Sequence, residues 1–541
     1  MKRDRLDRYV GAREAPSVSG DAITKVPPPL LGYGTHGKVG TRATFVETGV
    51  RVNKMNPVHQ TTVDRTIPPP RSVLFVRCRD GAAGFAVGSN GEIVLGGAQP
   101  RGRTFFGEPV ALGYLAFTEA WERFSYYGMS ALVVLYMTET LFLPGHVEHV
   151  AGFHGLRAAI EALTGPLSSQ GLASMIYGLY SGLICFTPLF GGLLADRLLG
   201  ARATVVTGAL LLCAGHLALA FDVSFLAGLL LLILGCGCVK GNVAAQVGAL
   251  YPRDDEAART RAFMLFNMGI NTGAVAGPIV CGLLAQLYGW HIGFACAALI
   301  MLAGLITYLA GLRHLPPEAR RATRAASGPP LTADEWRTIA LLTGVIALTV
   351  FQSIAYYQIG NAGMIWVRRM VDPATPFGPV PTAWFRSIDS FTSVILAAPL
   401  IALWRRQSAG GGGPSDYAKL GFGAAITAAS ALLLAIASTL AGPGKVSLLW
   451  PAAAFAGMGI GFLYYWPTLM ALVSRRTPAQ TTGAMLGVIF LSLFVAKITM
   501  GWVGSLYENM SPAAFWSLDA AIAGAGALLV AALWRPLARR C

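Results

Sequence analysis

Residues 224–250 read SFLAGLLLLILGCGCVKGNVAAQVGAL, a run of 27 residues in which Lys240 is the only charged side chain. A helix of about 20 apolar residues crosses the hydrocarbon core of a bilayer, so this run is long enough to span a membrane. Similar runs recur between residues 110 and 534. The chain is therefore predicted to be a membrane protein that crosses the bilayer many times.

The composition agrees with this prediction. Of the 541 residues, 54% are hydrophobic and 13% are charged, against roughly 25% charged in soluble domains. These values exclude a cytosolic enzyme, a disordered chain and a small secreted disulfide scaffold. The net charge is +15, but we do not expect the chain to bind nucleic acid. Its basic residues lie in short loops and in the N-terminal region, a distribution that is typical of membrane topology signals.

The eight cysteines lie mostly inside apolar runs, and no Cys and His residues cluster with the spacing of metal ligands. We therefore expect neither disulfides nor a metal site. No nucleotide-binding motif is present either, so an ion gradient is the expected energy source and no cofactor is expected.

Twelve apolar segments are predicted to cross the membrane. They are approximately 110–136, 171–195, 203–221, 224–250, 262–287, 291–312, 338–362, 385–404, 417–441, 447–473, 482–505 and 512–534. A hydrophilic stretch rich in Arg, Pro and Ala falls at their midpoint. Six segments on either side of a charged loop are typical of two packed helical bundles.

The chain is accordingly divided into four parts. Residues 1–108 hold 16 Lys/Arg, 9 Asp/Glu and two proline clusters, and we expect a mostly disordered tail in which only Ser72 to Leu95 could form short strands. Residues 109–312 are predicted to form an N-terminal six-helix bundle and residues 313–337 a cytoplasmic central loop. Residues 338–541 are predicted to form a C-terminal six-helix bundle with a short tail.

Loop charges predict the orientation in the membrane. If both termini are cytoplasmic, the inner loops and the C-terminus carry 18 Lys or Arg residues, and the outer loops carry four or five. Positive loops stay on the cytoplasmic side. We therefore expect a multi-pass protein of the cell inner membrane with both ends inside.

The first apolar segment carries a polar stripe. Glu119, Glu122, Arg123, Tyr126 and Tyr127 occupy positions i, i+3, i+4, i+7 and i+8, which places them on one face of a helix. A charge inside a membrane helix is costly unless it is paired or hydrated, so the stripe is expected to line a cavity or to pair with a neighbour. The alternative is a static ion pair between Arg123 and one glutamate. Because there are two glutamates and one arginine, one carboxylate would stay unpaired, which favours a functional site.

Two other segments carry polar side chains. Lys240 is too far from either end of its segment to reach the membrane surface easily, and with Arg123 it would form a cationic floor suited to a carboxylate. Asn267 and Asn271 lie one turn apart in the fifth segment, a spacing that equally fits hydrogen bonds between helices.

Several motifs resemble one known family. Residues 119–128, EAWERFSYYG, resemble the motif E-x-x-E-R-F-x-Y-Y-G of proton-dependent oligopeptide transporters, a branch of the major facilitator superfamily. Residues 192–197, GLLADR, with Gly200 and Arg202 resemble the superfamily's loop motif between helices 2 and 3. Residues 266–273, FNMGINTG, match the family's F-Y-x-x-I-N-x-G signature except at one position. The resemblance extends from about residue 103 to residue 536.

The resemblance implies an all-α membrane protein with the major facilitator fold, in which twelve helices form two six-helix bundles that open alternately to either side. It implies that Arg123 and Lys240 hold the C-terminal carboxylate of a peptide and that Glu119 and Glu122 take part in proton coupling. The other residues expected to contact the substrate are Tyr126, Tyr127, Asn271, Gln358, Tyr465 and Trp466. The loop motif, expected to serve gating, comprises Gly192, Asp196, Arg197 and Gly200.

Some positions depart from the family pattern. Ser130 and Tyr357 stand where members commonly have an arginine and its carboxylate partner, so both halves of that pair are absent. Phe462 aligns with the glutamate that holds the peptide's amino group, and Trp466 replaces a small residue on the same helix face. Two further pocket positions differ, at Cys185 and Asn267.

New charges appear in helices 8 and 11. Arg386 and Asp389 open the eighth segment, and Lys497 lies at a comparable depth in the eleventh. In one interpretation Asp389 belongs to a functional site and couples to protons. In the other, Arg386 and Asp389 form a pair near the surface and Lys497 extends outwards to water.

These observations predict a proton-driven symporter that imports small peptides and is not an enzyme. Because the amino-group partner is missing, a transporter of another carboxylate-bearing solute is the first alternative. A non-transporting sensor on the same fold is the second. The sequence leaves the oligomeric state and the preferred peptide length open.

Overall fold

The computed structural model describes five short strands between residues 38 and 96, and residues 104–252, 255–318, 330–409, 412–478 and 480–540. The chain divides into two compact units, Met1–Thr104 and Phe105–Cys541. Each unit is described separately below.

The first unit contains an antiparallel sheet in the order β1-β2-β3-β4-β5. Its strands are β1 (Lys38–Val39), β2 (Thr61–Asp64), β3 (Leu74–Cys78), β4 (Gly84–Val87) and β5 (Ile93–Gly96). Strands β3 to β5 coincide with the stretch for which the sequence allowed short strands. Strands β1 and β2 and the described residues 104–108 lie outside that stretch, in the part for which disorder was expected. The rest of residues 1–108 lies outside the described residues, and the prediction of disorder is not tested there.

The second unit is built from helices, preceded by a small hairpin of β6 (Thr104–Phe105) and β7 (Glu108–Pro109). The helices of its first half are α2 (Val110–Tyr136), η2 (Met137–Leu141), η3 (Val147–His149), α3 (Phe153–Thr164), α4 (Ser169–Phe186), α5 (Pro188–Leu194), η4 (Ala195–Leu199), α6 (Ala201–Ala218), η5 (Asp222–Ser224), α7 (Phe225–Ala249), α8 (Glu256–Tyr288), α9 (Trp290–Gly311) and η6 (Leu312–His314). The helices of its second half are α10 (Ala333–Tyr357), η7 (Gln358–Gly360), α11 (Ala362–Met370), η8 (Thr382–Ser387), α12 (Ile388–Ala409), α13 (Asp416–Ala441), α14 (Leu449–Arg476), α15 (Thr482–Ser505), η9 (Tyr507–Asn509) and α16 (Pro512–Arg540).

Among the described residues, eleven helical spans are long and apolar enough to cross a membrane. Helix α2 is 27 residues long but carries Glu119, Glu122 and Arg123, so its composition alone does not qualify it as a span. The predicted fold class, an all-α membrane protein, is confirmed. The count of twelve spans stays a prediction that depends on α2.

Two predicted segments are interrupted. The second segment breaks between α4 and α5, because Pro188 has no backbone N–H to continue the helix hydrogen bonds. Next to the break, the Thr187 hydroxyl donates to the Ile233 carbonyl of α7 at 3.0 Å. The seventh breaks after α10, where the short turn η7 precedes α11. Apolar residues run across both breaks, so hydropathy does not reveal them, and Pro188 is a sequence signal for the first one alone.

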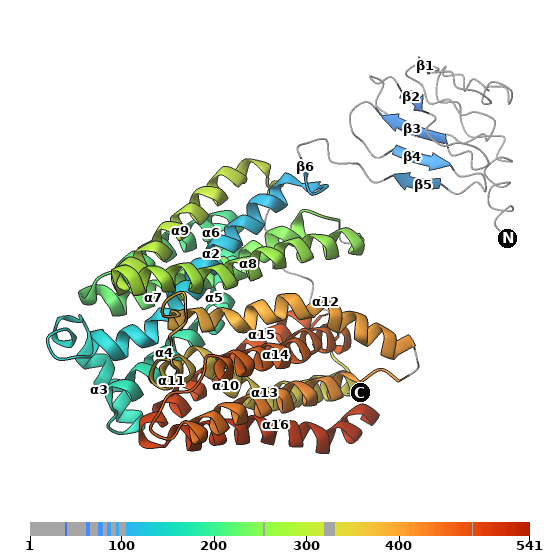
Figure 1. Ribbon diagram of the computed structural model, residues 1–541. Coiled ribbons are helices and arrows are strands. Elements are labelled where there is room, and N and C mark those ends of the chain that lie inside the picture. Colours follow the sequence, from blue (N-terminus) through green and yellow to red (C-terminus); the bar gives the residue numbers. More distant parts are fainter. Residues whose placement is uncertain are drawn as a thin grey trace. The chain divides into compact units, whose positions relative to one another are not determined.

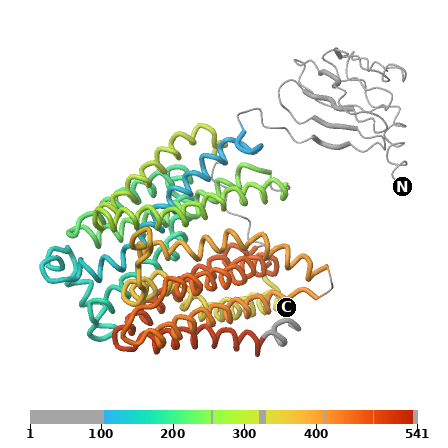
Figure 2. The backbone as a smooth tube through the Cα atoms, in the orientation of Figure 1, coloured from blue at the N-terminus to red at the C-terminus, as the bar shows by residue number. Residues whose placement is uncertain are grey.

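The helices of the second unit form two bundles (Figure 1). Helices α2 and α4 to α9 pack on one another, and so do helices α10 and α12 to α16. The two bundles lie side by side where α3, α4 and α11 lie, and their backbones diverge towards the opposite end (Figure 2). We call these the α3 end and the central-loop end, since α9 ends and α10 begins at the second (Figure 1).

Glycines on α8 bring that helix against the polar helix α2. A Cβ on Gly273 would lie 2.2 Å from the Ala120 carbonyl oxygen, and one on Gly277 would lie 2.3 Å from that of Phe124. Side chains larger than hydrogen are excluded at such distances, and small residues at one-turn spacing allow membrane helices to approach closely. This contact sets the rotation of α2 about its own axis, and so the direction in which its charged side chains point.

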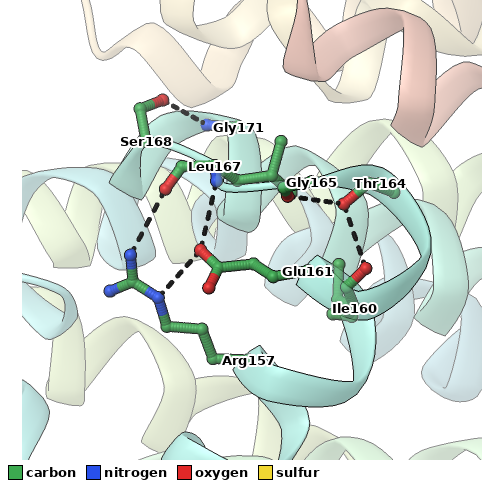
Figure 3. A network of polar contacts seen from close by, with 8 residues as sticks. All are labelled: Arg157, Ile160, Glu161, Thr164, Gly165, Leu167, Ser168 and Gly171. Carbon is green, nitrogen blue, oxygen red and sulfur yellow. Dashed lines mark hydrogen bonds and ion pairs between the residues drawn. The ribbon is translucent and has the colours of Figure 1, made fainter.

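Helix α3 is fastened to the start of α4 by a polar network (Figure 3). Glu161 accepts hydrogen bonds from Arg157 Nε at 3.0 Å and from the Leu167 backbone N–H at 3.1 Å. Ser168 caps α4 by accepting from the Gly171 N–H at 3.0 Å. The Leu167 N–H and the Arg157 guanidinium lower the pKa of the Glu161 carboxyl below its usual value. This short amphipathic helix was not among the elements predicted from sequence.

The two bundles touch closely at the α3 end. A Cβ on Gly178 of α4 would lie 2.6 Å from the Cα of Gly501 in α15, so the two backbones are in contact there. Arg368 donates to both oxygens of Glu139 at 2.8 and 3.1 Å, which joins α11 to η2. The bundles are therefore closed against each other at this end.

Helix α8 and the segment before α12 add hydrogen bonds between the bundles. Ser387 Oγ donates to the Val275 carbonyl at 2.7 Å, and Trp384 Nε1 donates to that of Ile279 at 3.0 Å. Gln286 Nε2 donates to the Pro379 carbonyl at 3.0 Å. The three α8 residues, Val275, Ile279 and Gln286, all lie in the second half of the helix. Their hydrogen bonds therefore extend the contact between the bundles at the α3 end.

Candidate functional site

The polar stripe of α2 forms one buried charge cluster. Glu119, Glu122 and Arg123 are each at most 5% exposed. Arg123 Nε lies 3.3 Å from Glu119 Oε1 and also contacts Glu122 Oε2. Among the described residues, Glu119 Oε2 and Arg123 Nη2 have no hydrogen-bond partner. The cluster therefore keeps an acceptor and a donor available for a ligand or a proton.

Lys240 of α7 adds a second cation to this region. It lies close enough to Glu119 to attract the carboxylate, and both Lys240 and Arg123 lie near Cys236 of α7. The Lys240 side chain is half-buried, and its Nζ lies 5.8 Å from the Phe490 ring centroid of α15. The structure thus brings together the two cations that the sequence singled out, at the boundary with the other bundle.

The tyrosines of α2 link the charges of the two bundles. The Arg123 guanidinium lies 5.3 Å from the Tyr126 ring centroid, and the Arg386 guanidinium of η8 lies 5.3 Å from that of Tyr127. The two tyrosine rings meet edge to face at 5.1 Å. Both side chains are half-buried, so they can present ring faces and hydroxyls to a ligand between the bundles.

Asp389 is occupied by protein partners. It accepts from Arg386 Nη1 at 2.9 Å and from the Tyr356 hydroxyl at 2.7 Å, and it is 2% exposed. The Arg386–Asp389 pair considered from sequence is therefore present, but it is buried and not near the surface. Lys497 does not extend outwards: it is 7% exposed, with its Nζ 4.4 Å from the Tyr357 ring centroid. A role of Asp389 in proton coupling stays a prediction.

Aromatic side chains form a wall on α14. The Phe462 ring stacks on Tyr356 at 5.0 Å and on Trp466 at 6.3 Å, with interplanar angles of 21° and 13°. Phe462 and Trp466 are half-buried, whereas Tyr465 is buried and its hydroxyl accepts from Ser353 Oγ at 3.1 Å. Where the resemblance leads one to expect a carboxylate, this bundle presents stacked rings.

Among the described residues, neither Gln358 nor Asn271 forms a hydrogen bond with the charge cluster of α2. Gln358 is fully buried; its Nε2 donates to the Met500 carbonyl at 3.0 Å and its Oε1 accepts from Asn361 at 3.3 Å. Its amide holds the break after α10 against α15. Asn271 is half-buried on α8, and Asn267 one turn earlier is exposed. Substrate contact by Gln358 or Asn271 remains a prediction.

The loop motif lies at the central-loop end, around η4. Asp196 and Arg197 are exposed and Gly192 is half-buried. Gly200 has a φ of +81°, and a Cβ there would lie 2.6 Å from Glu318 Oε2. The positive φ favours glycine at this position, and a larger side chain would also displace the Glu318 carboxylate. The expected gating role is not tested by this geometry.

Glu318 is a contact residue of this motif that the sequence reasoning missed. Its Oε1 accepts from the Arg202 backbone N–H at 2.6 Å, and Arg202 Nη2 donates to the Leu315 and Pro316 carbonyls at 3.0 and 2.6 Å. These bonds tie the start of α6 to the segment after α9. No sequence signal pairs Glu318 with the motif, because more than one hundred residues separate them.

Three further charged residues were also missed. The Glu139–Arg368 pair lines a cavity of about 220 Å³ between the bundles at the α3 end, together with residues of α8, α9 and η8. Asp519 of α16 is 0% exposed, and both its oxygens lack a hydrogen-bond partner among the described residues. Asp519 could have been found from sequence, because the rule that a charge in an apolar helix is a candidate applies to it.

The fold and the site together define a polytopic membrane protein with charged and aromatic side chains enclosed between two helical bundles. The chain belongs to the POT family, whose sequence model matches residues 202–323 and 332–517. This membership makes it a transporter and not an enzyme, and the predicted resemblance is confirmed.

Two curated relatives are similar over most of their length. A di-/tripeptide transporter of Lactococcus lactis subsp. cremoris is 28% identical over 493 residues, which cover 78% of this chain and 94% of the relative. A peptide transporter of Yersinia enterocolitica subsp. palearctica is 27% identical over 511 residues, which cover 80% of this chain and 95% of the relative.

Solved structures share the fold. A crystal structure of the peptide transporter POT in complex with sulfate has a TM-score of 0.71 at 24% identity and covers 82% of this chain and 98% of its own. A POT family transporter in complex with 5-aminolevulinic acid has a TM-score of 0.69 at 23% identity and covers 80% and 98%. The major facilitator arrangement expected from sequence is therefore the observed one.

Proposed function

We propose that the chain is a proton-coupled symporter that imports di- and tripeptides across the cytoplasmic membrane by alternating access. Membership of the POT family supports this function, and so do the names of the relatives from Lactococcus and Yersinia, which are peptide transporters. The orientation follows the loop charges, which put both termini and the central-loop end in the cytoplasm.

The observation that carries the proposal is the α2 cluster. Arg123 is buried beside two glutamates and keeps Nη2 without a hydrogen-bond partner among the described residues. A carboxylate that bound there would gain a charge-assisted hydrogen bond, with Lys240 as the second cation. Peptides of any side chain share a C-terminal carboxylate, so this contact suits a transporter that accepts many peptides.

Proton coupling is assigned to the same cluster. When a substrate carboxylate engages Arg123, Glu119 and Glu122 lose part of their compensation by this arginine. Two carboxylates with a shared and weakened counter-charge favour protonation of one of them. Binding of the peptide and of a proton then reinforce each other without a further cofactor.

The contacts at the α3 end support an assignment of the conformational state. With the proposed orientation, the Glu139–Arg368 pair and the Gly178–Gly501 contact lie on the outer side. The state described is then one in which the outer side is closed. Transport requires these contacts to separate so that the outer side can open.

The proposal is tested by uptake of dialanine into proteoliposomes, with and without an inward proton gradient. We expect accumulation that needs the gradient and is lost with a protonophore. In Glu119→Gln and Glu122→Gln, we expect exchange of dialanine without a gradient to continue and gradient-driven accumulation to fail. Glu148→Gln, in the exposed loop after η2, is the matched control. Accumulation in the parent that is indifferent to the gradient would overturn the coupling.

A transporter of a different carboxylate-bearing solute is the second candidate. It is favoured by Asp389, which is saturated by Arg386 and Tyr356, and by Phe462, which presents a ring where an amino-group partner is expected. Failure of dialanine to exchange, together with exchange of a simple monocarboxylate, would favour this candidate.

A further inference from the structure

Lys497 is a buried cation without an acidic partner. It lies eight residues before the end of α15, about 12 Å along the helix axis, and its side chain is 7% exposed. The nearest acid that the sequence suggested, Asp389, is paired with Arg386 at 2.9 Å. Among the described residues no carboxylate lies within ion-pair distance of Lys497 Nζ, which lies 4.4 Å from the Tyr357 ring centroid.

The position of Lys497 faces the other bundle. Its backbone carbonyl lies against α4, since a Cβ on Gly178 would be 2.9 Å from that oxygen. Tyr177 of α4 lies near both Lys497 and Arg386, and also near Tyr126. Lys497 therefore belongs to the layer of side chains between the bundles and not to the lipid-facing surface.

A line of tyrosines connects Lys497 with Arg123. Lys497 lies over Tyr357, whose neighbours include Tyr126 and Tyr127. Tyr126 in turn lies under the Arg123 guanidinium at 5.3 Å. The two cations are thus at opposite sides of the same tyrosine-lined region, one on each bundle.

The charge balance of the two sides differs. Arg123 has two adjacent glutamates, whereas among the described residues Lys497 has an aromatic face and no carboxylate beside it. An aromatic face attracts a cation more weakly than a carboxylate does. A buried cation in this state is compensated best by an anion that arrives with the ligand. A ligand ammonium group at the same place would instead be repelled by Lys497.

We infer that Lys497 is a specificity-determining residue that binds a second carboxylate of the substrate, so that the transporter prefers dipeptides with an acidic N-terminal residue. This inference rests on the proposed function, because it takes the C-terminal carboxylate to be held by Arg123 and Lys240. The side chain of the first residue then extends towards the C-terminal bundle, where Lys497 lies.

The test is competition in dialanine counterflow, with no proton gradient and the membrane potential clamped at zero, so that substrate charge does not bias the result. Glutamyl-alanine, alanyl-alanine, lysyl-alanine and alanyl-glutamate are the competitors. We expect glutamyl-alanine to compete roughly tenfold better than alanyl-alanine, as one added charge-assisted contact allows. Lysyl-alanine should compete worst, and alanyl-glutamate should gain less than glutamyl-alanine.

Variants locate the effect. The preference for glutamyl-alanine over alanyl-alanine should fall to near one in Lys497→Met and persist in Lys497→Arg. Lys445→Met, an exposed lysine in the loop between α13 and α14, is the matched control and should keep the preference. Equal competition by glutamyl-alanine and alanyl-alanine in the parent, or a preference that survives Lys497→Met, overturns the inference. Absence of any dialanine exchange in the parent overturns the proposed function instead.

Discussion

The two bundles treat their buried charges differently. On α2 of the first bundle, Arg123 lies beside two glutamates, yet Glu119 Oε2 and Arg123 Nη2 have no hydrogen-bond partner among the described residues. At the start of α12 in the second bundle, both oxygens of Asp389 accept hydrogen bonds, from Arg386, Tyr356 and Ser390, and among the described residues the unsatisfied atom of the pair is Arg386 Nε. The difference indicates that the first cluster can accept a ligand or a proton, whereas the Arg386–Asp389 pair holds its own part of the fold in place.

The largest effect is expected from breaking the Arg386–Asp389 pair. Asp389→Asn leaves the buried Arg386 without its counter-charge, which should cost about 3–5 kcal/mol of unfolding free energy. Thermal unfolding of the purified protein measures this loss. Replacing both partners, in Arg386→Met with Asp389→Leu, should recover most of it. An Asp389→Asn protein as stable as the parent would show that the pair does not hold the fold.

The next largest effect concerns substrate binding at the α2 cluster of Glu119, Glu122 and Arg123, with Lys240 beside it. Arg123→Ala or Lys240→Ala should weaken dialanine binding by about 2–5 kcal/mol, because each removes a cation from a partly desolvated carboxylate contact. Direct binding to the purified protein measures it, with Lys445→Ala as a control on an exposed lysine. Unchanged affinity in both variants would remove the basis for assigning carboxylate binding to the first bundle.

A smaller effect is expected at the substrate's amino end. The ring of Phe462 and its stacked neighbour Trp466 can attract an ammonium by only about 0.5–2 kcal/mol, so acetylation of the dialanine N-terminus should cost no more than that. Asp389→Asn should not change the ratio between the free and the acetylated peptide, since Asp389 is already occupied. A strong preference for the free amine that is lost in Asp389→Asn would identify Asp389 as the amino-group site.

The smallest effect lies outside the bundles, at Glu161. Its pKa is lowered by the Leu167 N–H and by Arg157, so its contribution to stability is present above the carboxyl's unfolded pKa and is lost as the pH falls through the lower folded value. Glu161→Gln should therefore melt at a slightly lower temperature than the parent at pH 7. The difference should vanish when the pH falls well below 4.5, the ordinary value for Glu. A difference that is constant with pH would contradict this role.

Much of the fold follows from the sequence. Apolar runs of membrane length locate helices such as α7 and α13, because burial in lipid requires them to be apolar throughout. The break at Thr187 could have been predicted from Pro188, which cannot continue a helix. The break after Tyr357 does not follow, because it depends on a hydrogen bond of Gln358 to a partner far away in the chain, Met500. Helix α3 is missed for another reason: it is short and does not cross the membrane.

The site was predicted in part. The stripe on α2 could be read because helical periodicity places its members on one face, and the structure brings Arg123 and Lys240 into the same electrostatic neighbourhood. The state of Lys497 could not be read, since it depends on whether Arg386 or Lys497 takes Asp389 as its partner. Two cations at a similar depth compete for one acid, and only the packed structure shows which of them pairs with it.

One measurement tests most directly whether the α2 cluster binds the carboxylate of a peptide. Dialanine and dialanine with an amidated C-terminus are supplied to proteoliposomes under the same inward proton gradient. The predicted result is gradient-driven accumulation of dialanine and none of the amide, because Arg123 and Lys240 need an anionic partner. Accumulation of the amide to the level of dialanine would contradict the assignment of these two residues.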